Sequence, residues 1–115
     1  MYNKSLLEWN FQTMGDCNPR ELIVLTHGFM AHRFMLNVLA RRLRQAGWNT
    51  DIWGYESFVT SVTTHARNFS DFLAERCSDD RYDRIHLVTH SMGCIIGRMA
   101  IHQVQSEKIK RFVML

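Results

Sequence analysis

The stretch that decides the fold is Ile85–Gly97, with the sequence IHLVTHSMGCIIG. It begins as a short apolar run, which is typical of a buried strand, and continues with helical spacing after Ser91. A strand that turns into a helix at a serine, with a small residue two positions later, has the pattern of a nucleophile elbow. We expect a strained turn there, with no room for a side chain at Gly93, while Gly97 lets the helix approach the sheet closely.

Outward from this stretch, apolar runs alternate with helical patterns. Further strands are predicted at 22–25, 50–53 and 111–115, and further helices at 32–46 and 61–77. The run 22–25 is continuously apolar, which favours a strand buried on both faces and hence a parallel sheet. The residues that the helix after Ser91 is expected to direct inward are Ile95, Ile96, Met99, Ala100 and Val104. The alternation predicts an α/β fold, with a mostly parallel sheet and helices on both faces.

The composition indicates one globular domain. The chain has 115 residues, 46% of them hydrophobic and 22% charged, with a net charge of +3. We expect residues 1–20 to form an N-terminal arm or edge segment and residues 21–115 to form the domain. Three scattered cysteines show neither zinc-site pairing nor the density of a disulfide scaffold. We expect no metal and no cofactor.

Partners and location follow from the same composition. The arginines near residues 41–44 are interpreted as a solvated helix face, so no nucleic-acid partner is expected. The sequence shows no signal peptide and no stretch of membrane-spanning length, which makes a cytoplasmic location the default expectation.

Two strand ends carry the residues of chemical interest, His27-Gly28-Phe29 and His90-Ser91-Met92. Ligands of open α/β sheets bind beyond the carboxyl ends of the strands. If the two strands are neighbours, the Ser91 hydroxyl faces a loop that can bring a backbone N–H close to a substrate oxygen. Two such donors stabilise the oxyanion of acyl transfer, and losing one costs about 3 kcal/mol. The natural donors are the N–H groups of Phe29 and Met92.

These two motifs resemble the α/β-hydrolase superfamily, on its lipase and esterase side. The loop Gly54–Ser57 and a following helix with His65 are similar to lipase-like members with the same Thr-His-Ser-Met-Gly elbow, and the resemblance covers about Glu21–Leu115. It implies a serine hydrolase that acts on small-molecule esters or lipids, with Ser91 as the nucleophile and with Phe29 and Met92 as the oxyanion hole. The residues that support the motifs are His27, Gly28, His90 and Gly93.

The chain departs from the family pattern in two ways. Thr89 stands where the common elbow has glycine, although threonine is small enough for that position. In the family, the acid and the histidine of the triad follow the nucleophile. Here the residues after Ser91 include only His102 and Glu107, and His102 lies about 16 Å along the helix at 1.5 Å per residue.

We therefore expect the sequence to be the N-terminal half of a hydrolase domain, incomplete at its C-terminus, inactive alone and prone to self-association. His32 and His65 remain weaker candidates for the base, and His86 is expected to be a core or cover residue.

Two other interpretations stay open. The first is a non-catalytic, hydrolase-like module that binds a ligand or a partner without turnover. The second is an unrelated nucleotide-binding domain, which is disfavoured because the sequence has neither Gly-x-Gly-x-x-Gly nor a phosphate-loop lysine.

Overall fold

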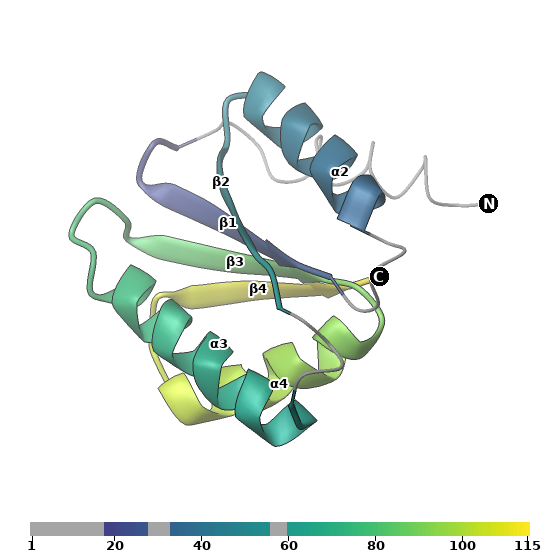
Figure 1. Ribbon diagram of the computed structural model, residues 1–115. Coiled ribbons are helices and arrows are strands. Elements are labelled where there is room, and N and C mark those ends of the chain that lie inside the picture. Colours follow the sequence, from purple (N-terminus) through teal and green to yellow (C-terminus); the bar gives the residue numbers. More distant parts are fainter. Residues whose placement is uncertain (1–17, 28–32, 56–59) are drawn as a thin grey trace.

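Strands and helices alternate along the whole described part of the chain. The structure is a computed structural model that describes residues 18–27, 33–55 and 60–115. Its elements, in order, are β1 (Glu21–Thr26), α2 (Arg33–Gln45), β2 (Asn49–Trp53), α3 (Val62–Cys77), β3 (Arg84–Thr89), α4 (Met92–Val104) and β4 (Ile109–Met114) (Figure 1). The predicted order of strands and helices is confirmed. The expected N-terminal arm lies almost entirely outside the described residues.

The four strands form one sheet in the order β2-β1-β3-β4, and every pairing is parallel. Register places Leu22 between Asn49 and Ile85, and Thr26 between Trp53 and Thr89. The predicted parallel sheet is therefore confirmed. All four strands end at one edge, which we call the carboxyl edge, and begin at the opposite amino edge.

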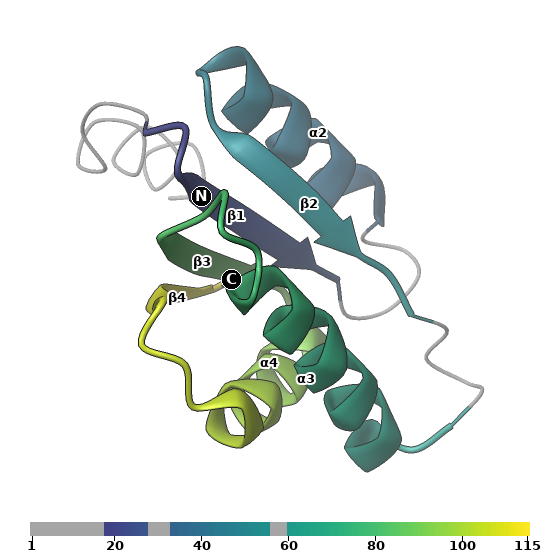
Figure 2. The same ribbon diagram turned by 90° about the vertical axis from the view of Figure 1, so that its left-hand side faces the viewer.

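Helices cover the sheet from both sides. Figures 1 and 2 show α2 on one face and the pair α3 and α4 on the other. Alternate residues of β1 enter two separate apolar cores: Ile23 and Leu25 pack in the α2 core, whereas Leu22 and Val24 pack in the core of α3 and α4. All four are at most 2% exposed. The apolar run of β1 is thus explained by burial on both faces.

The layer of α3 and α4 is the one next to the candidate nucleophile. Phe69 and Leu73 of α3 are fully buried, as the helical pattern predicted. On α4, Ile96 and Ala100 are buried, but Ile95 is 56% exposed, so its predicted inward position is wrong. The buried face of α4 runs along its glycines, Ile96 and Ala100, and Ile95 lies about 100° around the helix from Ile96. None of the described helices is both long enough and apolar enough to span a lipid bilayer.

Candidate functional site

Ser91 stands at the turn between β3 and α4 with an unusual backbone conformation. Its φ is 56° and its ψ is −126°, and its side chain is exposed. A positive φ costs a residue with a side chain about 1 to 3 kcal/mol, and the surrounding structure must hold it in place. Here the His90 N–H donates to the Thr26 carbonyl at 3.2 Å, and the Leu115 N–H donates to the Thr89 carbonyl at 2.8 Å. The strained turn of a nucleophile elbow is therefore present, and its serine faces solvent.

The two glycines of α4 allow close packing around this turn. A Cβ atom at Gly93 would lie 2.7 Å from the carbonyl oxygen of His27, so the end of β1 presses against the first turn of α4. A Cβ at Gly97 would lie 3.1 Å from the Thr89 methyl carbon and 3.2 Å from the Phe112 ring. The sequence predicted a space restriction at Gly93, and the structure adds the neighbouring strand end as one source of it.

The backbone N–H of Met92 is available beside the nucleophile. The next two N–H groups of the helix are engaged, Gly93 with the His90 carbonyl at 3.0 Å and Cys94 with the Ser91 carbonyl at 2.9 Å. No described residue accepts a hydrogen bond from the Met92 N–H. As the first residue of α4, Met92 also lies at the positive end of the helix dipole. The second expected donor, Phe29, lies outside the described residues, as does Gly28.

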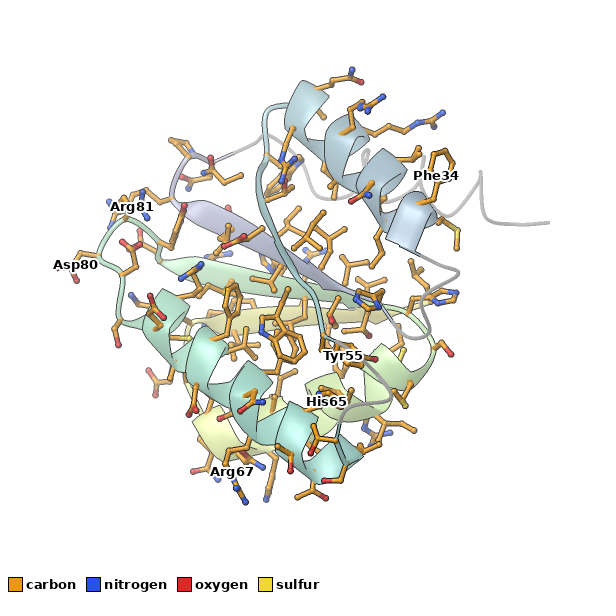
Figure 3. The ribbon with its side chains drawn as sticks, in the orientation of Figure 1. Phe34, Tyr55, His65, Arg67, Asp80 and Arg81 are labelled. Atoms are coloured by element: carbon orange, nitrogen blue, oxygen red, sulfur yellow. The ribbon has the colours of Figure 1, made fainter. Side chains whose placement is uncertain are left out.

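A stack of three aromatic rings lies beside the elbow. His27 is 2% exposed, and its ring stacks on Tyr55 with centroids 4.8 Å apart and planes at 3°. The Tyr55 N–H donates to His27 Nε2 at 3.4 Å, which requires that nitrogen to be unprotonated. On the other side of Tyr55 the His65 ring lies with its centroid 4.7 Å away, and Figure 3 shows the two side chains next to each other near the start of α3.

Burial controls the protonation of Tyr55. It raises the pKa of the phenol to about 12, because the phenolate would lose hydration, and the Cys94 thiol contributes in the same direction. The hydroxyl therefore remains protonated at neutral pH. Both the Tyr55 hydroxyl oxygen and His65 Nε2 are buried without a hydrogen-bond partner.

The histidines do not complete a triad with Ser91. No described side chain hydrogen-bonds to its hydroxyl. His86 is 3% exposed, as expected for a core residue, and its Nε2 lies 2.7 Å from a carboxylate oxygen of Glu21, the first residue of β1. His102 is exposed on the last turns of α4, and His32 lies outside the described residues.

Exposed apolar side chains gather at the carboxyl edge. The large apolar residues that are exposed in the described part belong to the first turns of α2 and α4 and to the end of β4: Phe34, Met35, Ile95, Met114 and Leu115. Phe34 is 77% exposed at the start of α2 (Figure 3). A cavity of about 400 Å³ at the same edge is lined by His27, Leu36, Asn37, Ile52 and Gly54. The surroundings of Ser91 thus offer apolar contact area.

Sequence reasoning did not foresee the ring stack. It named Tyr55 only in the loop after a strand and His65 only as a weak candidate base. The position of Tyr55 is a usable signal, because a residue just past β2 must lie at the same edge as one just past β1. Its contact with a residue of α3 could not be deduced, since that contact depends on how α3 crosses the sheet.

Comparison with known proteins adds no family to this geometry. In the described part of the chain, no group of three or more His, Cys, Asp or Glu side chains is placed to hold a metal ion. The chemistry of the site therefore has to be argued from its own backbone and side chains. A scan against models of protein families matched none of them, and a search of curated proteins gave no match.

Proposed function

We propose that the chain is a serine hydrolase of the α/β-hydrolase type, which cleaves carboxylic esters or lipids through an acyl-enzyme on Ser91. The observation that carries this proposal is the turn itself. An exposed serine at φ 56° is followed directly by the unengaged N–H of Met92 at a helix start. A nucleophile and an oxyanion donor on adjacent residues are what acyl transfer requires.

The reaction follows from these two groups. The Ser91 hydroxyl oxygen attacks the ester carbonyl carbon while its proton passes to a general base. The carbonyl oxygen becomes an oxyanion, which the Met92 N–H stabilises at the positive end of the α4 dipole. Collapse of the tetrahedral intermediate breaks the bond to the alcohol, which leaves with a proton. Water then attacks the acyl-enzyme by the same steps and releases the carboxylic acid.

The residues around the turn favour an apolar ester as substrate. The exposed apolar side chains of the described part lie at the edge that carries Ser91, and the nearby cavity has Leu36 and Ile52 in its wall. Apolar surface gains about 25 cal/mol per Å² when a ligand covers it, so an acyl chain would bind more tightly here than a polar group. The family resemblance implies that the base and acid follow Ser91 in chain order.

Covalent labelling tests the nucleophile directly. A fluorophosphonate probe should label the wild-type protein, and Ser91→Ala should abolish both labelling and hydrolysis of p-nitrophenyl butyrate. Ser78→Ala is the matched control, because Ser78 is an exposed serine at the end of α3, near the amino edge. Unchanged labelling in Ser91→Ala would rule out the assignment.

The second candidate function is a hydrolase-like module that binds an ester or lipid without turnover. One observation favours it: no described histidine contacts Ser91, so nothing in the described part activates the hydroxyl. Binding of a fatty-acid ester by the wild type, with neither labelling nor hydrolysis, would select this alternative.

A further inference from the structure

Two buried polar atoms next to the elbow have no hydrogen-bond partner. They are the hydroxyl oxygen of Tyr55, a residue 8% exposed, and Nε2 of His65, a residue 4% exposed. Buried polar groups in native proteins are nearly always hydrogen-bonded, and an unsatisfied one destabilises the fold. Two such atoms on rings 4.7 Å apart indicate that something binds between them.

The two side chains come from different elements that meet at the elbow. Tyr55 follows β2 by two residues, and His65 lies in the first turn of α3. The influence of Cys94 on the Tyr55 phenol shows that the phenol also approaches α4, one helical turn after Ser91. Figure 3 shows Tyr55 and His65 together between the strand ends and the start of α3. A ligand here would lie beside the residues that hold the nucleophile.

The surroundings define the chemistry of this ligand. Tyr55 belongs to the apolar core that contains Ala66, Phe69 and Ile96, so an ion would lose its hydration there without a compensating charge. The phenol is a donor, and Nε2 is an acceptor or a donor according to its tautomer. A hydroxyl oxygen can both donate and accept, so it matches either tautomer, whereas a carbonyl oxygen only accepts.

We propose that Tyr55 and His65 form a binding site for one neutral hydroxyl oxygen, supplied either by a buried water molecule or by a hydroxyl group of the substrate. The substrate source rests on the proposed function, and the water source does not. With water, the site would fasten the end of β2 to α3 beside the elbow. With a substrate hydroxyl, it would select hydroxylated esters over plain ones.

Removal of the phenol oxygen alone separates these cases. Tyr55→Phe keeps the ring stack with His27, and Tyr82→Phe is the control, because Tyr82 lies in the loop that precedes β3, near the amino edge. If water occupies the site, Tyr55→Phe lowers the folding equilibrium constant about fivefold in urea titrations, the value of one net hydrogen bond. If the site is empty in the free protein, Tyr55→Phe is as stable as the wild type or more stable.

Two substrates then test the second source. If the substrate hydroxyl binds, Tyr55→Phe lowers kcat/KM for p-nitrophenyl 3-hydroxybutyrate about tenfold relative to p-nitrophenyl butyrate, the lower end of the discrimination expected from a lost hydrogen-bond partner. If water binds, both esters are affected equally.

An unchanged or raised folding constant together with an unchanged substrate ratio would overturn the proposal. If the wild type shows no Ser91-dependent turnover, the proposed function fails, and the unfolding measurement alone decides between a water site and no site.

Discussion

A methyl group at Gly93 would test whether the end of β1 holds the elbow in position. The added Cβ would lie 2.7 Å from the carbonyl oxygen of His27 and 3.1 Å from its carbonyl carbon. Both are backbone atoms, so no side-chain rotation relieves the contact. To move from 2.7 Å to an ordinary contact at 3.4 Å, α4 and β1 must separate by 0.7 Å.

The cost to stability is partly offset within the helix. Overpacking typically costs about 1 to 3 kcal/mol, whereas glycine to alanine in a helix interior gains up to about 1 kcal/mol. We therefore expect Gly93→Ala to lower the free energy of unfolding by about 0 to 2 kcal/mol. The effect on turnover should be larger, because displacing reacting groups by about 1 Å can cost on the order of a hundredfold in rate. We expect kcat for p-nitrophenyl butyrate to fall at least about tenfold.

Gly97→Ala is the matched control on the same helix. Its Cβ would meet side-chain atoms of Thr89 and Phe112 at 3.1 and 3.2 Å, and these can shift by a few tenths of an ångström. We expect its turnover to stay near the wild-type level. Wild-type turnover in Gly93→Ala, or an equal loss in both variants, would refute the argument that the His27 carbonyl positions the nucleophile.

Two further predictions concern stability and pH. Leu73→Ala removes a fully buried side chain of α3 and should cost about 2 to 5 kcal/mol in urea unfolding, whereas Ile95→Ala, at a position 56% exposed, should change it by at most about 0.5 kcal/mol; equal effects would contradict the burial pattern. The hydrogen bonds from the Arg81 side chain lower the pKa of Asp79 from 3.8 to about 2, so this pair stabilises the fold above pH 3.8 and loses its effect as the pH falls through about 2. NMR titration should show that midpoint in the wild type and its return towards 3.8 in Arg81→Gln; a midpoint that stays low in the variant would exclude Arg81 as the cause.

The fold could be predicted from the sequence because each element carries its own periodicity. The apolar run of β1 predicted burial on both faces, and the abrupt change of pattern at Ser91 predicted the turn into α4. Parallel pairing followed, since strands joined by helices return to the same edge. The position of Ile95 could not be predicted, because Ile95 and Ile96 are equally apolar and only packing against α3 decides which one is buried.

The candidate site was predictable in part. The elbow is local in sequence, so Ser91 and Met92 could be named from the chain alone. The ring stack of His27, Tyr55 and His65 joins three separate segments and has no local signature. Such contacts depend on the crossing angle of α3 over the sheet, which sequence periodicity does not specify.

The strand order has a consequence for synthesis on the ribosome. β1 lies between β2 and β3, and Glu21 pairs with Arg84, which is translated 63 residues later. At about 5 to 20 residues per second, β1 leaves the ribosome roughly 3 to 13 s before its partner β3. During that interval the most apolar strand of the described sheet has at least one unpaired edge, a template for association with other nascent chains. We expect the nascent protein to depend on chaperones that bind extended apolar segments, most strongly between the translation of β1 and that of β3.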